Sequence, residues 1–259
     1  MYLSTVKSGI KVFKWLRAML HSCLPDSLCY LCQQPAAAQV CRTCEHDCLY
    51  FNYPVVPANL LQWPPIKKGL TRGYYSSVYA CGYYQWPLNQ LVKQFKTGHP
   101  QLAQTLAEWF VRYAWSSEAP LPGCILPVPT SAWRFARRRY HQTLLLANAI
   151  GQKLSVPVYT DWASRGSLQR KQQLLGRQAR LNNLTQAYTL SETSLPSRVA
   201  ILDDVVTTGA TAATLSKMLK AANPDIQIDL WAIAITPSKP DSAALVPGSI
   251  RKLRMKLPN

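Results

Sequence analysis

The stretch 199–211 constrains the fold of this chain more than any other part of the sequence. It consists of the apolar run Val199–Leu202, two adjacent carboxylates, Asp203 and Asp204, and a loop of small residues that leads into a helical pattern. A short, β-branched apolar run is typical of a central strand in a parallel sheet that is covered on both faces. The sequence therefore predicts an α/β fold, with helices flanking a parallel sheet. Because loops and helix N-termini converge at the carboxyl ends of such strands, we expect the two carboxylates at a ligand site.

The loop after the carboxylates has the composition of an anion site. It comprises Thr207, Thr208, Gly209, Ala210 and Thr211. Unpaired backbone N–H groups and the positive end of a helix dipole favour a phosphate there, and Gly209 permits close approach of the backbone. The two carboxylates can accept hydrogen bonds from two neighbouring hydroxyls. Together they predict a sugar-phosphate site; the alternative is an ordinary strand–loop–helix unit with Asp204 as a turn residue.

Six of the eight cysteines fall within the first fifty residues. Four of them form two Cys-x-x-Cys pairs: Cys29, Cys32, Cys41 and Cys44. Each pair can place two thiolates on one metal, so the spacing predicts a tetrahedral, structural zinc site. Disulfides are the alternative, but they need an oxidising compartment, and the sequence shows no evident export signal. In a module this small, bound zinc would supply much of the folding free energy.

The charge is strongly one-sided. Lys and Arg total 29 against 12 Asp and Glu, which gives a net charge of +17. Two segments, 119–160 and 162–191, contain no acid but several arginines, among them Arg134, Arg137, Arg138 and Arg139. Such a field attracts polyanions, so it indicates nucleic acid, anionic lipid or a phosphorylated substrate as a partner. The alternative is a basic surface without a specific partner.

The pattern along the chain predicts five segments. They are a basic amphipathic helix (1–22), the cysteine module (23–50), a proline-rich linker (51–68), an α/β domain (69–237) and a basic, flexible tail (238–259). The amphipathic helix could lie on a membrane surface or pack on protein, and we favour the packing or docking of a partner in the cytoplasm. No run of about eighteen apolar residues, the length that a membrane-spanning helix needs, occurs in the sequence.

Within the α/β domain the hydrophobic periodicity predicts a series of strands and helices. We expect strands at 74–84, 124–129 and 226–235, helices at 87–94, 101–115 and 133–154, and a loop or hood at 165–190.

The stretch 199–211 closely resembles the phosphoribosyl-pyrophosphate (PRPP) signature of the type I phosphoribosyltransferases, in which four apolar residues, two acids and two variable residues precede Thr-Thr-Gly-x-Thr. The resemblance implies that Asp203 and Asp204 are the catalytic pair and hold the ribose hydroxyls, while Thr207–Thr211 holds the 5′-phosphate. A second loop cradles pyrophosphate in that family, with Mg²⁺ bridging the oxygens of the ligand. By its order along the chain, Val128–Thr130 is this loop. The candidate pyrophosphate or DNA contacts are Lys96, Thr130, Arg134, Arg137, Arg138 and Arg139.

The order of cysteine pairs followed by this domain resembles the ComF family of competence-associated proteins over roughly residues 20–237. Supporting segments are 87–96, 127–129, 138–142 and 172–188. Members commonly have Arg-Gly-Phe-Asn-Gln at the third segment, so Arg139 and His141 depart from the family pattern.

The resemblance implies a protein that assists the uptake and inner-membrane translocation of single-stranded DNA in natural transformation and that binds PRPP. It also implies a DNA-translocation helicase or a recombination mediator as partner, at the inner face of the cytoplasmic membrane. The alternatives are an active phosphoribosyltransferase that transfers ribose 5-phosphate to a small nucleophile, and transcriptional regulation through PRPP sensing. Purine-salvage enzymes carry an acid where this chain has Thr207, so the sequence indicates the donor half of a transferase and not the acceptor half.

Overall fold

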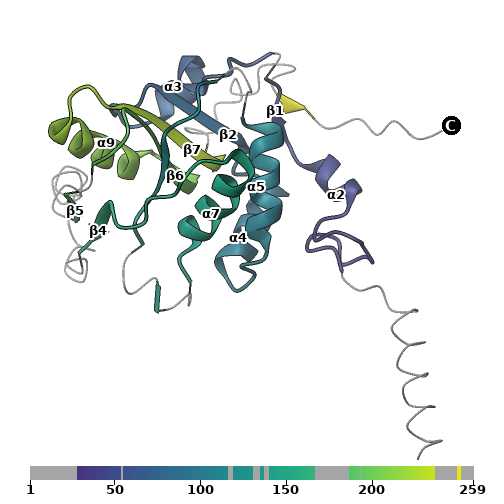
Figure 1. Cartoon of the computed structure of the whole chain (residues 1–259). Helices are drawn as coiled ribbons and strands as arrows, with labels where there is room; N and C mark the ends of the chain where they lie inside the picture. The colour runs from purple at the N-terminus through teal and green to yellow at the C-terminus, as the bar shows by residue number, and fades with distance from the viewer. Residues whose placement is uncertain are drawn as a thin grey trace, which may run out of the picture.

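The computed structural model of the chain describes residues 28–53, 55–115, 119–130, 135–136, 140–166, 187–192, 194–236 and 250–251 (Figure 1). The amphipathic helix predicted at 1–22 lies outside the described residues, as do most of the predicted loop at 165–190 and most of the predicted tail. Four of the candidate contacts also lie outside them: Arg134, Arg137, Arg138 and Arg139.

A six-stranded sheet forms the centre of the described part (Figure 1). Its strands, in spatial order, are β3 (Cys124–Pro127), β6 (Arg198–Val206), β7 (Gln227–Ile235), β2 (Ser77–Tyr83), β1 (Tyr50–Phe51) and β8 (Ile250–Arg251). The first four strands are parallel to one another, whereas β1 and β8 pair antiparallel at the edge. The predicted α/β fold with a parallel sheet is confirmed, and β6 is an interior strand as its apolar run predicts.

Helices cover both faces of this sheet, each over its own hydrophobic cluster. The first face carries α4 (Leu88–Lys96), α5 (Leu102–Tyr113) and α7 (Gln142–Leu154). The second carries the 3₁₀ helix η1 (Leu60–Gln62), α3 (Pro64–Gly69) and α9 (Ala210–Ala222). A separate pair of antiparallel strands, β4 (Ala163–Arg165) and β5 (Tyr188–Leu190), lies beyond the sheet, and α2 (Arg42–Asp47) belongs to the cysteine module.

Burial on both faces explains the uninterrupted apolar run of β6. Successive side chains of a strand point to opposite faces. Ala200 and Leu202 accordingly belong to the cluster under α4, α5 and α7, while Val199 and Ile201 belong to the cluster under α9. All four residues are 0% exposed.

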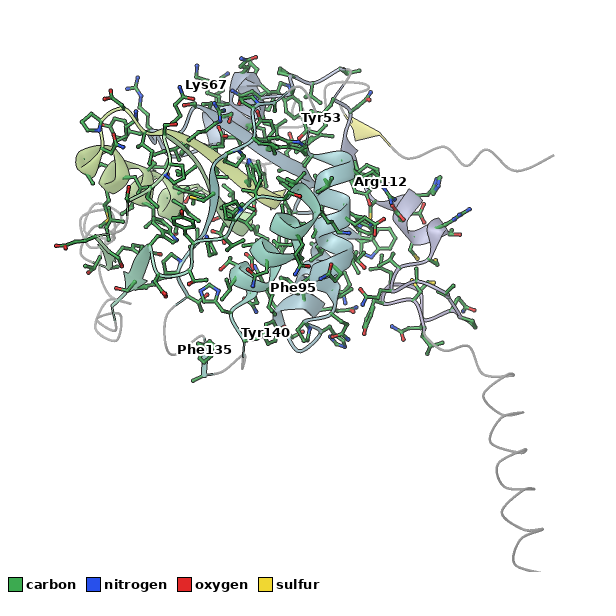
Figure 2. All side chains as sticks on the ribbon, in the orientation of Figure 1. Tyr53, Lys67, Phe95, Arg112, Phe135 and Tyr140 are labelled. Atoms are coloured by element: carbon green, nitrogen blue, oxygen red, sulfur yellow. The ribbon has the colours of Figure 1, made fainter. Side chains whose placement is uncertain are left out.

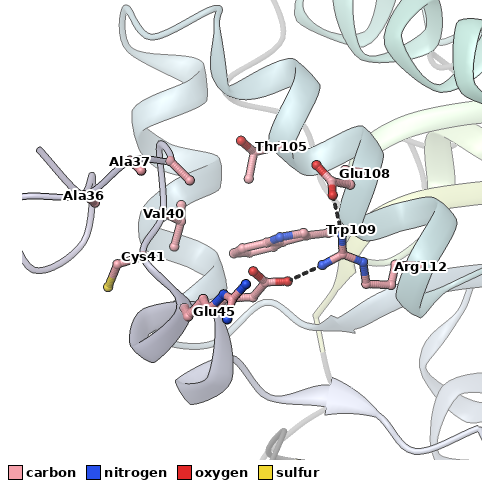
Figure 3. Close-up of a pocket in the computed structure, with 11 residues that line it drawn as sticks. Ala36, Ala37, Val40, Cys41, Glu45, Thr105, Glu108, Trp109 and Arg112 are labelled. Atoms are coloured by element: carbon pink, nitrogen blue, oxygen red, sulfur yellow. Dashed lines mark hydrogen bonds and ion pairs between the residues drawn. The ribbon is translucent and has the colours of Figure 1, made fainter. Parts of the chain in front are cut away.

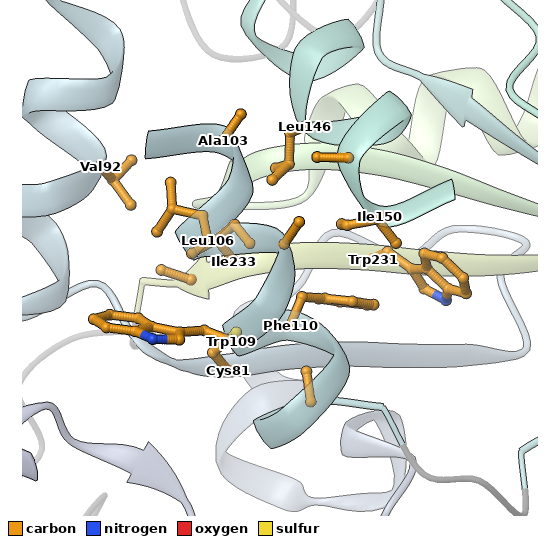
Figure 4. Packing of buried hydrophobic residues seen from close by; sticks show 14 of the residues in the cluster. Cys81, Val92, Ala103, Leu106, Trp109, Phe110, Leu146, Ile150, Trp231 and Ile233 are labelled. Atoms are coloured by element: carbon orange, nitrogen blue, oxygen red, sulfur yellow. The ribbon is translucent and has the colours of Figure 1, made fainter. Parts of the chain in front are cut away.

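Helix α5 joins the parallel strands to the antiparallel edge. Its Phe110 packs on Trp231 of β7 with ring centroids 5.1 Å apart (Figure 4). Its Trp109 meets Tyr50 of β1 edge-on at 5.7 Å. Both contacts are buried, so aromatic packing fixes the edge strand against the central strands through this one helix.

The segment for which the sequence predicts a linker is packed onto the domain. Leu60, Trp63 and Ile66 are buried in the cluster of the second face. Pro64 and Pro65 occupy the first positions of α3. Proline is compatible with the first turn of a helix, because the N–H group that it lacks would have no intrahelical partner there. The prolines therefore start a helix in this segment rather than prevent one.

Two further elements differ from their predicted bounds. Of the helix predicted at 133–154, the structure describes Phe135 and Ala136, which are helical, and α7 from Gln142, where the side chain of His141 accepts a hydrogen bond from the Leu144 N–H and caps the helix. Residues 133–134 and 137–139 lie outside the described residues. Within the predicted tail, Ile250 and Arg251 pair with β1 as strand β8.

A buried ion pair ties three parallel strands together at the amino edge of the sheet. Asp229 of β7 is 0% exposed and accepts two hydrogen bonds of 2.9 Å from the guanidinium of Arg198, the first residue of β6. Ser77 of β2 donates to the same carboxylate. The carboxylate of Asp229 is thus paired on both sides, as a buried charge must be.

The substitution Asp229→Asn tests this network. Removing the charge leaves the Arg198 guanidinium partly buried without its partner, so we expect the free energy of unfolding to fall by about 3–5 kcal/mol in urea titrations. The matched control is Glu108→Gln, which breaks an exposed ion pair with Arg112 on α5. That loss is expected to stay below about 1 kcal/mol. Equal losses of unfolding free energy in the two variants would contradict a buried, stabilising ion pair at the amino edge of the sheet.

Candidate functional site

The two adjacent carboxylates lie where β6 extends past its neighbour β3. Pro127, the last residue of β3, pairs with Leu202, and β6 continues to Val206 alongside β7. The strand is thus longer than the apolar run alone indicates, and Asp203 and Asp204 stand in its last four residues, at the carboxyl edge of the sheet. Alternation along the strand directs Asp204 toward the α4 side and Asp203 toward the α9 side.

Asp204 is paired with Lys96, a residue from the end of α4. Asp204 is 7% exposed, and one of its carboxylate oxygens lies 2.9 Å from the Lys96 Nζ. The Asp204 N–H also donates to the Asp203 carboxylate at 2.8 Å. The structure therefore brings together three of the residues predicted for the site, one of them from a distant part of the sequence.

The turn that carries Lys96 is held by Tyr140 and by the first residue of α7, Gln142. The hydroxyl of Tyr140 donates to the carbonyl of Phe95, and the two side chains lie close together in Figure 2. The Gln142 side chain donates to the carbonyl of Lys96 at 3.1 Å, and the Gly98 N–H donates to the Tyr140 hydroxyl at 3.3 Å. Tyr140 and Gln142 lie in the family segment 138–142, but the sequence pattern predicts no such role for them.

The loop predicted to bind an anion follows β6 directly. Thr207 and Thr208 are exposed, whereas Gly209 is buried and has a positive φ of 71°. A Cβ atom at Gly209 would lie 3.2 Å from the Leu70 side chain, so glycine fits both the backbone angle and the space. Gly209 is the N-cap of α9 and offers no side-chain acceptor to the first amides of the helix, which favours an external acceptor such as a phosphate.

The candidate pyrophosphate loop follows β3 on the other side of β6. The Val128 N–H donates to the Leu202 carbonyl at 2.9 Å, which holds the start of the loop beside the acidic pair. The backbone nitrogen of Thr130 lies 3.2 Å from Nε2 of His141. Burial lowers the pKa of His141 below its usual value. His141 departs from the family pattern at 138–142, and the sequence predicts no contact between it and Thr130.

The four predicted cysteines form one cluster. The Sγ atoms of Cys29, Cys32, Cys41 and Cys44 all lie within 4.8 Å of one another. The Cys32 and Cys41 sulfurs are 3.8 Å apart. Zinc–sulfur bonds of ~2.3 Å in a tetrahedron put neighbouring sulfurs about 3.8 Å apart, so the spacing fits four thiolates around one ion. All seven cysteines of the described part are free thiols.

Backbone amides surround the cluster. The N–H groups of Leu31 and Cys41 donate to the Cys29 sulfur at 3.4 Å, and the Cys44 N–H donates to the Cys41 sulfur at 3.4 Å. Burial by itself raises the pKa of Cys29, but hydrogen bonds from nearby backbone amides outweigh it and lower that pKa to about 6. Because the thiolate is the form that binds metals, the cluster could hold a metal ion. Cys48 lies outside it, and burial raises the pKa of that thiol to about 12.

The cysteine module is docked on α4 and α5. The Gln94 side chain donates to the carbonyl of Tyr30, which lies between two cysteines of the cluster, at 2.7 Å. Glu45 of α2 accepts from Arg112 at 2.9 Å and from the Tyr113 hydroxyl at 2.6 Å. Between the module and α5 lies a cavity of about 590 Å³, with Glu45 and Arg112 among the residues that line it (Figure 3). Gln94 is two residues from Lys96, so the module contacts the same turn that reaches Asp204.

Comparison with known proteins identifies the family. No family model matches the chain. The chain is 34% identical over 161 residues to competence protein F of Haemophilus influenzae, an alignment that covers 59% of this chain and 70% of the relative. The chain belongs to the competence protein F family. The family predicted from the order of the cysteine pairs and the PRPP-like motif is therefore confirmed.

Other relatives extend the alignment. The chain is 28% identical over 229 residues to the DNA utilization protein YhgH of Salmonella typhi, covering 81% of this chain and 97% of the relative. Among solved structures, an adenine phosphoribosyltransferase from Leishmania tarentolae matches 61% of this chain and 83% of its own, with 13% identity and a TM-score of 0.31. Among the described residues, no helix is long and apolar enough to cross a membrane.

The metal content of purified protein tests the cysteine cluster. We expect one metal ion per chain by elemental analysis and its loss in Cys41→Ser, because three thiolates no longer close the tetrahedron. Cys124→Ala is the matched control, since Cys124 lies in β3 and outside the cluster. Removal of the ion is expected to lower the melting temperature as well. Equal metal content in both variants would show that these four thiols do not form the site.

Proposed function

We propose that this protein acts in DNA utilization during natural transformation, where it assists the uptake and inner-membrane translocation of single-stranded DNA and binds PRPP at the carboxyl edge of its sheet. Membership of the competence protein F family and the printed names of the relatives support the DNA role. A DNA-translocation helicase or a recombination mediator is the proposed protein partner. The cytoplasm, at the inner face of the membrane, is the proposed location.

The arrangement around Asp203 and Asp204 carries the PRPP part of the proposal. A ribose ring needs acceptors for its hydroxyls, and its 5′-phosphate needs N–H donors. The strand end supplies the two carboxylates, and the Thr207–Thr211 loop stands at the start of α9 directly after it. When PRPP binds, the Lys96 ammonium would exchange its ion pair with Asp204 for one with the pyrophosphate, because pyrophosphate carries more negative charge than a single carboxylate. Mg²⁺, bound with PRPP, would supply further charge neutralisation on the pyrophosphate oxygens.

The cysteine cluster is assigned to zinc in this proposal. Four sulfur ligands at tetrahedral spacing are the donor set of closed structural zinc sites. Its thiolates would hold the loops of the module in the shape that docks on α4 and α5, so the ion stabilises the fold and takes no part in chemistry.

The DNA part is supported by charge and by an exposed aromatic ring. The chain carries 29 basic against 12 acidic residues. Phe135 is 51% exposed and extends from the body of the protein in Figure 2, between the arginines at 134 and 137 in the sequence. Bases of single strands stack on such rings, while arginines neutralise the phosphates.

The first test is single-stranded DNA binding, followed by fluorescence anisotropy of a labelled oligothymidine across a salt series, with and without Mg²⁺–PRPP. We expect affinity to fall steeply with salt, and PRPP to change it in the wild type but not in Asp203→Asn/Asp204→Asn. Charge reversal at Arg137, Arg138 and Arg139 is expected to reduce the slope of log K against log salt by about 2, because each phosphate contact contributes about 0.7. No binding at low salt would contradict the DNA role.

Lys96 provides a separate test of the PRPP site. We expect Lys96→Met to weaken Mg²⁺–PRPP binding by roughly tenfold or more in calorimetry, since hydrogen bonds to charged groups contribute about 1.5–3 kcal/mol. The control is Lys93→Met, an exposed lysine on the same helix, which should bind as the wild type does. If both variants bind PRPP equally, Lys96 is not part of the site.

An active phosphoribosyltransferase is the second candidate function, favoured by the complete Asp203–Thr211 motif. Its residues would stabilise the leaving pyrophosphate while the sugar acquires positive charge. It predicts release of pyrophosphate from PRPP only with a specific acceptor, and loss of that release in Asp204→Asn. A broad panel of nucleophiles that yields no release would argue against turnover and leave PRPP as a bound ligand.

A further inference from the structure

Helix α4 presents three sides, and described parts of the chain cover two of them. The first side packs into the core through four residues that are at most 1% exposed: Leu88, Leu91, Val92 and Phe95. The second side contacts the cysteine module, where the Gln94 side chain donates to the Tyr30 carbonyl. The third side carries Asn89, Lys93 and Lys96, whose spacing of four and three residues places them on one face of a helix. We call these three residues the α4 row.

The α4 row leads from open surface to the candidate site. Lys93 is exposed, whereas the Lys96 side chain is 22% exposed and its Nζ lies 2.9 Å from the Asp204 carboxylate. The side of α4 that carries the row therefore faces the carboxyl edge of the sheet. Among the described residues Lys93 has no ion-pair partner, and the sequence contains no acid between Asp47 and Glu108. Lys93 therefore presents an uncompensated positive charge, which favours an anionic partner.

An exposed indole stands at the beginning of the same helix. Trp86 is 65% exposed, the highest value among the large hydrophobic side chains of the described residues. The backbone is held on both sides of it, because the Tyr84 N–H donates to the Ile235 carbonyl at 2.8 Å and the Asn89 N–H donates to the Gln85 carbonyl at 2.9 Å. The turn thus presents a large aromatic face to solvent from a fixed backbone. Stacking on an unpaired base requires such a face.

A second exposed aromatic ring stands near the other end of the row. The Tyr140 hydroxyl donates to the carbonyl of Phe95, the residue before Lys96. Phe135 lies five residues before Tyr140 in the sequence and is 51% exposed, and Figure 2 shows both in the same part of the molecule as Phe95. The row therefore connects Trp86 with the region of the aromatic ring that supports the DNA role.

We propose that Trp86 and the α4 row form a binding surface for single-stranded DNA that leads to the candidate PRPP site. Trp86 stacks on a base, the Lys93 ammonium pairs with a phosphate, and the Asn89 amide donates to the strand. A duplex keeps its bases stacked on one another and leaves no open face for the indole, so the surface selects single strands. This inference rests on the proposed DNA role.

The dimensions of the helix fit this partner. The nine residues of α4 extend over ~14 Å, which corresponds to about four nucleotides at the ~3.4 Å spacing of stacked bases. Because Lys96 ends the row at Asp204, a strand on this surface lies beside the sugar and phosphate groups of PRPP. The two ligands therefore occupy neighbouring sites, and their phosphates repel each other.

The first test measures the affinity of the full-length protein for a labelled oligothymidine at low salt by fluorescence anisotropy. Trp86→Ala is expected to weaken binding roughly five- to hundredfold, the range found when a residue that stacks on a base is changed to alanine. Trp86→Phe keeps an aromatic face and is expected to retain most of the affinity. The matched control is Tyr74→Ala, since Tyr74 is 57% exposed but lies along α9 and outside the surface. Circular dichroism establishes that the variants fold.

The second test concerns the phosphate contact. Lys93→Met is expected to lower the slope of log K against log salt by about 0.7, the contribution of one phosphate on a single strand. Its affinity for Mg²⁺–PRPP should stay that of the wild type. Lys217→Met, which changes an exposed lysine on α9, should leave the slope unchanged.

The outcomes separate this surface from the DNA role as a whole. Wild-type affinity in Trp86→Ala, an equal loss in Tyr74→Ala, or an unchanged slope in Lys93→Met would overturn the inference and leave the DNA role in place. If the wild type does not bind oligothymidine at low salt, the proposed DNA role fails and the inference fails with it.

Discussion

The charge of Asp204 at the end of an interior strand is the constraint on which the arrangement around the candidate site depends. A carboxylate that is 7% exposed must be paired, because burying an unpaired charge costs several kcal/mol. Lys96 supplies the partner, and the end of α4 must therefore reach across the sheet to β6. The contacts of Tyr140 and Gln142 with the carbonyls of Phe95 and Lys96 hold that turn in place. The segment before α7 is thereby fixed beside the same strand end.

The cysteine module acts on this arrangement through the same turn. The Tyr30 carbonyl accepts a hydrogen bond from the Gln94 side chain, and the Tyr30 ring packs edge-on against His99, with ring centroids 5.0 Å apart. Tyr30 therefore contacts residues on both sides of Lys96 in the sequence. The module therefore supports the turn that carries Lys96. Its loops have little apolar surface of their own to bury, and the metal that the four thiols could hold would give them the rigidity that a support needs. The module and the acidic pair are thus parts of one structure.

The sequence predicts those features that short-range patterns determine. The strand at β6, the glycine loop and the two cysteine pairs each depend on residues within a few positions of one another. The sequence does not predict the ion pair between Lys96 and Asp204, because that pair depends on where the end of α4 lies over the sheet. It also treats Pro64 and Pro65 as a linker, although the burial of Trp63 and Ile66 makes them the start of a helix. Tertiary burial decided these cases against local propensity.

The chemistry of the strand end supports binding more directly than turnover. In the proposed site, the acidic pair and its lysine would bind the sugar and the pyrophosphate of PRPP, which form the donor half of a transfer reaction. An acceptor would have to be activated by a base, and the position that carries an acid in purine-salvage enzymes is Thr207, an exposed hydroxyl. A threonine hydroxyl does not take up a proton near neutral pH, so it cannot replace that acid. In the proposed PRPP site, the exposed hydroxyl of Thr207 in place of an acid therefore favours a ligand that is retained over one that is turned over.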